Sequence, residues 1–280
     1  MREERSWEQE FRSGERFAFG ENWASFLERL TDDRISSAED SLKDMLELDT
    51  LEDKRFLDAG SGSGLFSLAA RRLMAEVVSF DYDPKSVACA TELKRRYCPA
   101  DPAWRIAQGS VLDTDFLASL GKFDIVYSWG VLHHTGAMYR ALENVAGLVA
   151  PSGQLFISIY NDQGRASRRW TKVKRAYIRS PRPLKGMILF LALARLWGPP
   201  ALRKLLEGEL RSFRPAKQSV PRGMDLWHDA KDWVGGFPFE VAKPEQVFEF
   251  YRNRGFELRR ITTCGGGLGC NEYVFRRIAS

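Results

Sequence analysis

Cysteine and histidine are scarce in this 280-residue sequence, and long apolar runs are missing. None of the four cysteines stands in a CxxC pair and there are only three histidines, so we expect reduced thiols and no metal site. Residues 1–17 are charged throughout and lack the apolar core of a signal peptide. The most apolar stretch, residues 186–198, is too short to cross a bilayer and contains Arg195. These absences favour a soluble, cytoplasmic protein.

Internal repeats and low-complexity tracts are missing too, which leaves an ordinary globular fold as the expectation. The 44% of hydrophobic residues and 28% of charged residues are typical of a globular protein. Because the length suits one large domain, we treat residues 1–280 as a single domain.

Positive charge is concentrated in one segment of the chain. Between Arg165 and Lys217 there are fifteen Lys and Arg residues against two acids, a net charge of +13. Since the whole chain carries +5, the remainder carries −8. A basic block on an acidic body predicts attraction to an anionic partner, which is nucleic acid, lipid headgroups or a phosphorylated substrate. The alternative is a solvated helical face without a partner.

Short apolar strands alternate with helices after residue 50. Residues 21–50, which precede them, have apolar residues at the spacing of helices. We expect strands at 55–60, 77–83, 104–110, 123–129 and 154–160, and helices at 65–74, 84–97 and 138–150, the last ending at Pro151 and Gly153. This alternation predicts a doubly wound, mostly parallel α/β sheet. In such sheets ligands bind beyond the carboxyl ends of the strands.

The alternation breaks after residue 160. Residues 161–244 are first basic and then aromatic, which predicts a helical lid inserted after the fifth strand. A helix at 244–256 and two β segments at 257–263 and 271–277 return the chain to the sheet as a terminal pair with one antiparallel strand, which makes seven strands. The expected parts are an N-terminal helical cap (1–50), a ligand-binding core (51–160), the lid (161–244) and the return to the sheet (245–280).

The stretch LDAGSGSG (57–64) is a glycine-rich turn behind the first expected strand. A P-loop is excluded, because Leu65 and Phe66 follow Gly64 where Lys and Ser or Thr are needed. The dinucleotide fingerprint also fails, since its third glycine falls at Leu65. Asp81 lies seventeen residues beyond Gly64, at the end of the second expected strand, where a carboxylate can accept both hydroxyl protons of a ribose. The turn and the acid together predict a ligand that contains ribose.

Five motifs in order resemble the class I S-adenosylmethionine-dependent methyltransferases. They are DAGSGSG, FDYDP, GSVLD (109–113), FDIVYSWGVLHH and APSGQLFIS, and they cover about residues 50–160. The resemblance is greatest to the quinone-type and related small-molecule O-methyltransferases. It implies the Rossmann-like fold of that family, S-adenosylmethionine as the cofactor and a cofactor-binding core at residues 51–160.

The resemblance also implies which residues contact the cofactor. Asp58 holds the turn or meets the methionine ammonium, and Asp81 binds the ribose hydroxyls. The other implied contacts run from the methionine end to the adenine and comprise Trp129, Gly60, Gly62, Gly64, Tyr82, Ser110 and Val111.

Two histidine-containing motifs supply candidate catalytic groups. His133 and His134 follow the fourth expected strand, and an imidazole pKa of about 6.5 suits proton removal near neutral pH. The alternative is that these rings only form structural hydrogen bonds. The motif DLWHDAKDW offers His228 and Asp229 as catalytic groups and Asp225, Trp227 and Trp233 as substrate contacts, or is simply a polar helix cap. Trp23, in FAFGENW, is a further candidate for substrate binding, with packing in the core as the alternative.

Basic and aromatic residues alternate at 165–185, ahead of the apolar stretch 186–198. This pattern can follow a phosphate backbone, or lie on an anionic membrane surface as a peripheral contact. No RNA-binding motif is recognisable, so nucleic acid ranks lower. We expect methyl transfer to a small molecule, first of all at oxygen and to an acceptor that is lipid-linked or phosphorylated. The alternatives are an RNA methyltransferase and a non-catalytic, cofactor-binding regulatory protein.

Overall fold

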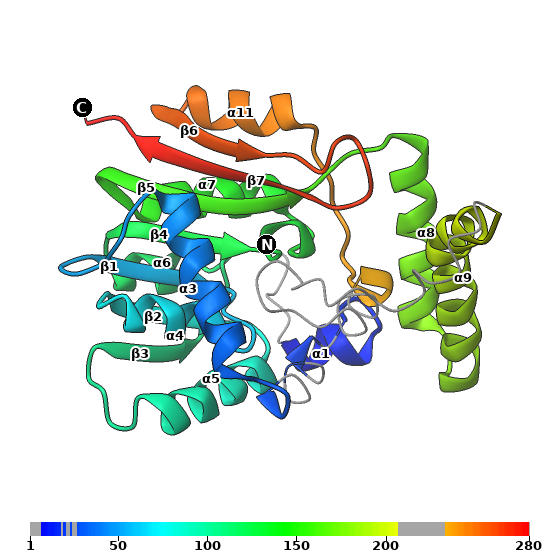
Figure 1. The fold of residues 1–280 in the computed structure, drawn as a ribbon, viewed down its shortest axis with the longest axis horizontal. Coiled ribbons are helices and arrows are strands. Elements are labelled where there is room, and N and C mark those ends of the chain that lie inside the picture. Colours follow the sequence, from blue (N-terminus) through cyan, green and yellow to red (C-terminus); the bar gives the residue numbers. More distant parts are fainter. Residues whose placement is uncertain (1–6, 18, 21–22, 24–26, 207–232, 280) are drawn as a thin grey trace.

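A seven-stranded sheet forms the centre of the molecule (Figure 1). The computed structural model describes residues 7–17, 19–20, 23, 27–206 and 233–279. The strand order is β3-β2-β1-β4-β5-β7-β6, for β1 (Arg55–Ala59), β2 (Glu76–Asp81), β3 (Trp104–Gln108), β4 (Phe123–Trp129), β5 (Val149–Tyr160), β6 (Phe256–Thr262) and β7 (Cys270–Arg277). Only β7 runs antiparallel to its neighbours β5 and β6. The predicted doubly wound, mostly parallel sheet is confirmed.

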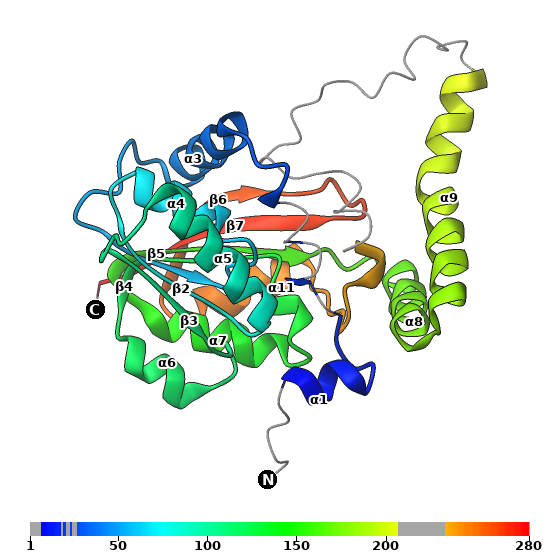
Figure 2. The same cartoon turned by 90° about the horizontal axis from the view of Figure 1, so that it is seen from below.

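Helices cover both faces of this sheet (Figure 2). On one face lie α3 (Asp32–Leu46), α4 (Leu65–Arg72) and α5 (Pro84–Tyr97), and on the other α6 (Thr114–Leu120), α7 (Met138–Leu148) and α11 (Pro244–Arg252). The strands are apolar throughout because side chains alternate between the two faces of a strand and helices cover both faces of the sheet. Neighbouring residues of β1 show this. Phe56 packs in the core under α3 and α4, and Leu57 packs in the core under α7.

Two local features differ from the sequence-based expectation. Strand β5 begins at Val149, so Pro151 and Gly153 lie inside a strand and do not end a helix there. Val149 pairs with Phe123 and the register then shifts, so Pro151 falls in an irregular stretch where its missing N–H is tolerated. The short helix α6 was not predicted. The Asp113 side chain caps it by accepting hydrogen bonds from the next turn.

The segment after β5 forms the helices α8 (Arg165–Arg179) and α9 (Arg182–Leu206). They pack against each other outside the two helical layers, and α9 is the outermost element in both views (Figures 1 and 2). Within the described ranges, no helix has the length and apolar character needed to cross a membrane.

The strand order places a ligand site at the carboxyl ends of β1, β2 and β4. The chain winds outward in one direction through β2 and β3, and in the other through β4 and β5. The crevice at such a reversal is where open α/β sheets bind ligands.

We expect Asp113→Ala to lower the free energy of unfolding by about 1 kcal/mol, because the helix loses its N-cap. The carboxylate accepts hydrogen bonds from the backbone N–H groups of Asp115 and Phe116. Thr31→Ala is the matched control, since Thr31 precedes α3 without a side-chain cap bond. Urea denaturation followed by circular dichroism measures both, and equal losses would contradict the capping role.

Candidate active site

The glycine turn leaves β1 in a conformation that demands glycine. Gly60, Gly62 and Gly64 have φ angles of 83°, 54° and 81°, in the left-handed region. A Cβ at Gly60 would lie 2.5 Å from the methyl groups of Val131, and one at Gly64 would lie 2.9 Å from the Ala90 Cβ. Gly64 therefore brings α4 close to α5 and does not line the cavities, whereas Gly60 and Gly62 do.

Asp81 ties the glycine turn to the end of β2. Its carboxylate accepts hydrogen bonds from the backbone N–H of Gly62 (2.9 Å) and of Asp83 (2.8 Å). Burial raises the pKa of Asp81 to about 6, against the lowering effect of these two hydrogen bonds and of Arg16. Each carboxylate oxygen has two lone pairs, so Asp81 can accept further hydrogen bonds from a ligand.

Asp58, at the end of β1, is the second buried carboxyl group of the site. It accepts a hydrogen bond from the Ser67 Oγ at 2.6 Å. Burial, with a smaller contribution from the nearby charge of Asp81, raises the pKa of Asp58 to about 7, against the lowering effect of the Ser67 hydrogen bond. A buried carboxyl group of this kind becomes a stable anion when a cation binds beside it.

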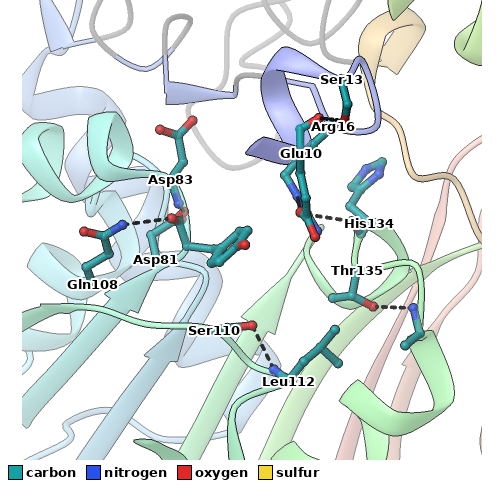
Figure 3. Close-up of polar contacts among 12 residues, drawn as sticks. Glu10, Ser13, Arg16, Asp81, Asp83, Gln108, Ser110, Leu112, His134 and Thr135 are labelled. Atoms are coloured by element: carbon teal, nitrogen blue, oxygen red, sulfur yellow. Dashed lines mark hydrogen bonds and ion pairs between the residues drawn. The ribbon is translucent and has the colours of Figure 1, made fainter. Parts of the chain in front are cut away.

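A cavity of about 130 Å³ lies between the ends of β2 and β4. It brings together Asp81, Tyr82, Ser110, Val111 and Trp129, which the family resemblance assigns to the cofactor. The Ser110 Oγ accepts a hydrogen bond from the backbone N–H of Leu112 at 3.1 Å, which shapes the loop at the cavity edge (Figure 3).

The N-terminal segment closes over this cavity. Arg16 forms an ion pair with Glu10 (2.7 Å) in α1 (Trp7–Arg12) and donates to the backbone oxygen of His134 (3.1 Å) (Figure 3). Its guanidinium carbon lies 4.9 Å from the centroid of the Tyr82 ring. The backbone N–H of Gly20 donates to Asp83 at 2.8 Å. The sequence did not identify Arg16 as a site residue, because no local motif marks a contact across so many residues.

A second cavity, of about 470 Å³, adjoins the first at the glycine turn. Among the described residues, its carboxyl groups are those of Asp58 and Glu272. The Trp129 Nε1 donates a hydrogen bond to Glu272 at 2.7 Å, across the sheet from β4 to β7. The other walls are largely aromatic: Phe19, Trp23, Phe66, Tyr127, Trp129, Tyr160 and Trp233. Trp23 and Trp233 were predicted to bind substrate, whereas Tyr160 and Glu272 were not identified.

The two predicted histidines lie in the short 3-10 helix η1 (Leu132–His134) and are buried. His133 has no exposed surface, lines neither cavity, and packs 4.1 Å from the Tyr160 ring. Burial lowers its pKa well below 6.5. His134 lines both cavities, but burial lowers its pKa to about 3.

The hydrogen bond of His134 fixes which ring nitrogen carries the proton. Its Nδ1 lies 2.6 Å from the backbone oxygen of Pro238, and a carbonyl oxygen can only accept, so Nδ1 donates. A general base for neutral pH needs a pKa near 7, which neither histidine has. A catalytic role for the two histidines stays a prediction, and only His134 forms a ring hydrogen bond among the described residues.

The remaining predicted site residues, Asp225, Trp227, His228 and Asp229, lie outside the described residues. Near them in sequence, Trp233 packs against the inner side of α8. The Nζ of the buried Lys174 lies 4.4 Å from the centroid of the Trp233 ring and 4.6 Å from that of Phe239. Among the residues that the structure describes, no group of three His, Cys, Asp or Glu side chains could hold a metal ion.

The raised pKa of Asp58 makes stability depend on pH. The carboxyl loses its proton near pH 4 when unfolded and near pH 7 when folded, so the folded state binds more protons between these values and stability falls as pH rises. Asp58→Asn should not show this loss, so its free energy of unfolding relative to the wild type should rise by about 3 kcal/mol between pH 5 and pH 8. Urea denaturation across this range tests it. The control Asp40→Asn, at an exposed position of α3, should show no such gain.

Comparison with known proteins is consistent with this geometry. A family model described as a methyltransferase domain matches residues 23–207. The ubiquinone biosynthesis O-methyltransferase of Rhizobium johnstonii is 30% identical over 141 residues, which are 50% of this chain and 54% of that protein. The chain spans about half or less of the length of the curated relatives it matches.

Solved structures share the fold at low sequence identity. An O-methyltransferase family protein from Burkholderia thailandensis has a TM-score of 0.54 at 12% identity, covering 89% of this chain and 58% of that one. The magnesium protoporphyrin IX methyltransferase of Synechocystis PCC 6803, with bound SAH, has a TM-score of 0.50 at 14% identity and covers 87% and 83%. The sheet order and the family match over more than half of the sequence agree, and this chain belongs to the methyltransferase-domain family.

Proposed function

We propose that this protein transfers a methyl group from S-adenosylmethionine to a small-molecule acceptor, with oxygen as the acceptor atom. The observation that carries the proposal is the pair of cavities that meet at the glycine turn. The first presents the carboxylate of Asp81 beside apolar walls, and the second is lined by aromatic rings and Glu272.

The chemistry of the donor set fits this cofactor. Asp81 has lone pairs for two ribose hydroxyls, and Tyr82 and Val111 offer apolar surface for a purine ring. Asp58 is a buried carboxyl whose raised pKa reflects the cost of a negative charge without a nearby cation. The ammonium group of the methionine moiety supplies such a cation. The bound SAH in the Synechocystis structure of the same fold supports this assignment.

When bound, the cofactor supplies an electrophilic methyl group on a sulfonium. The work of the chain is to hold the acceptor in line with that group and to exclude water. Trp23 and Phe19 line both cavities and therefore close the junction where the methyl group must lie. Positioning of this kind lowers the barrier without any group of the protein entering a covalent bond.

The second cavity fits a flat, apolar acceptor. Seven aromatic side chains line it, and aromatic walls bind ring compounds by stacking and edge contacts. This lining favours a lipid-linked ring compound over a phosphorylated one. The ubiquinone O-methyltransferase relative supports oxygen as the acceptor atom.

Glu272 is the proposed proton acceptor. A hydroxyl acceptor loses its proton during methyl transfer, so a base beside it speeds the reaction. Glu272 already accepts the Trp129 N–H, which holds the carboxylate at the cavity wall, and a carboxylate can accept from a second donor as well. His133 lines neither cavity, and burial lowers the pKa of both His133 and His134.

We expect Asp81→Asn to weaken binding of S-adenosylhomocysteine by about 100-fold, because two charge-assisted hydrogen bonds to the ribose are lost. Isothermal titration calorimetry measures the dissociation constant. Asp113→Asn is the matched control: it also neutralises an Asp, but Asn keeps the N-cap of α6 and residue 113 lines neither cavity. Equal affinity in Asp81→Asn and wild type would refute the ribose assignment.

We expect Glu272→Gln to lower kcat for a hydroxyl acceptor by about 100-fold, since the amide cannot take a proton. Gln still accepts the Trp129 N–H, so cofactor affinity should not change. The assay is transfer of labelled methyl from S-adenosylmethionine to catechol and hydroquinone, compared with an aromatic amine. Glu257→Gln, on β6 and away from both cavities, is the control. Labelling of the amine alone would contradict oxygen as the acceptor atom.

A further inference from the structure

Helix α9 exposes a continuous set of large apolar side chains, called here the apolar face. Its members, Leu184, Met187, Phe190 and Leu191, are 38%, 54%, 71% and 58% exposed. Their spacing of three, six and seven residues places them on one side of the helix. The other side, with the buried Ala192 and Leu193, packs toward α8. Exposed apolar patches of this kind mark interaction sites in soluble proteins.

Helix α8 carries a matching set of charges, called here the basic stripe. It contains no acidic residue, and none of its exposed cations pairs with an acid among the described residues. Helical spacing puts six cations within about one third of the circumference. They are Arg165, Arg168, Arg169, Lys172, Arg175 and Arg179. A one-signed stripe that forms no ion pair with the acids in the described part of the chain attracts an anionic surface.

The basic stripe and the apolar face border the same groove. A cavity of about 570 Å³ lies between α8 and α9, lined by Arg169 of the stripe and Leu191 of the apolar face. Trp170, Val173 and Ile188 form its apolar floor, and Arg195 adds a second guanidinium. The groove therefore joins positive charge to exposed apolar surface, and the two helices that carry it lie outside the helical layers of the sheet (Figure 2).

We propose that the α8–α9 pair docks on the surface of an anionic lipid bilayer. The basic stripe contacts lipid phosphates, the apolar face enters the boundary between headgroups and acyl chains, and the groove receives part of an acyl chain. A helix pair with a polybasic side and a bulky apolar side has the composition of a surface-bound amphipathic element. An RNA backbone would match the charges but would leave Phe190 and its neighbours in water.

The docking surface goes beyond the proposed methyl transfer, yet it is linked to the acceptor cavity. Lys174 lies on the opposite side of α8 from the basic stripe and packs against Trp233, which lines that cavity. The proposed docking surface and the aromatic cavity therefore lie on opposite sides of the same helix.

Sedimentation of the 280-residue chain with lipid vesicles tests the docking. We expect binding to phosphatidylcholine vesicles that contain phosphatidylglycerol, at least about tenfold above binding to phosphatidylcholine alone, and a decrease with added salt. Equal binding to both vesicle types, or none to either, would overturn the proposal.

Two pairs of substitutions assign the contact. We expect Phe190→Ser with Leu191→Ser, and separately Arg168→Gln with Lys172→Gln, to reduce vesicle binding by at least about fivefold. The matched controls are Ile278→Ser, at an exposed apolar residue, and Arg105→Gln with Arg140→Gln, at exposed arginines of other elements. The controls should bind vesicles as the wild type does. Unchanged binding in either test pair would contradict the docking surface.

A second measurement separates this proposal from methyl transfer. Each variant should bind S-adenosylhomocysteine as the wild type does, because none of the substituted residues lines the cofactor or acceptor cavity. Loss of vesicle binding with intact cofactor binding supports docking alone. A different result would show a nucleic-acid site and make the proposal wrong. In that case vesicles do not sediment the chain, but a single-stranded RNA oligonucleotide binds it. Arg168→Gln with Lys172→Gln would weaken RNA binding, and Phe190→Ser with Leu191→Ser would leave it unchanged.

Discussion

The parallel pairing of β1 with both β2 and β4 is the constraint on which the site depends. It sets Asp58 opposite Ser79 of β2 and Tyr127 of β4, so that β2 and β4 each extend about one residue beyond the end of β1. The glycine turn can then fold back on β2, where the backbone N–H groups of Gly60 and Ser61 both donate to the oxygen of Phe80. Since those bonds hold the turn, the Asp81 carboxylate meets the Gly62 N–H without further adjustment.

Burial controls the charges of the site in opposite directions for acids and bases. It raises the pKa of Asp58 and Asp81 and lowers the pKa of His133 and His134. Ionising these two buried carboxyl groups costs desolvation free energy, and a ligand with a cation and several hydroxyl groups can offset that cost. Both histidine rings pack against the Tyr160 ring, and His134 also bonds to the backbone oxygen of Pro238. The site is therefore prepared for a cofactor by desolvation, and a proton acceptor must come from elsewhere, as Glu272 does in the proposed mechanism.

Helix α8 joins the two surfaces that the proposals concern. Its inner side buries Lys174 among Tyr160, Trp233 and Phe239, next to the aromatic cavity. Its outer side carries only positive charge on the exposed positions of the basic stripe. The helix has this strong amphipathic division because one face must cover an aromatic cluster while the other remains in contact with water or with an anionic partner.

Local sequence determined most elements of the core and marked the glycine turn and Asp81 as candidates for ligand binding. The strand for residues 123–129 and the helix for 84–97 lie where the sequence predicts them, because apolar periodicity and a proline at the first turn are local signals. The glycine turn and Asp81 could also be identified, since both lie at strand ends and their chemistry is set by residue type.

Only the tertiary structure decided the rest. Arg16 meets His134 across 118 positions of the chain, and Trp129 meets Glu272 across 143, so no local pattern could join them. The two histidines looked suited to acid–base chemistry by type, but packing buries them and holds them neutral. Pro151, which the sequence marked as the end of a helix, lies in β5 because the irregular pairing with β4 needs no N–H there. Residue type and spacing are local properties, whereas burial and long-range pairing belong to the folded chain.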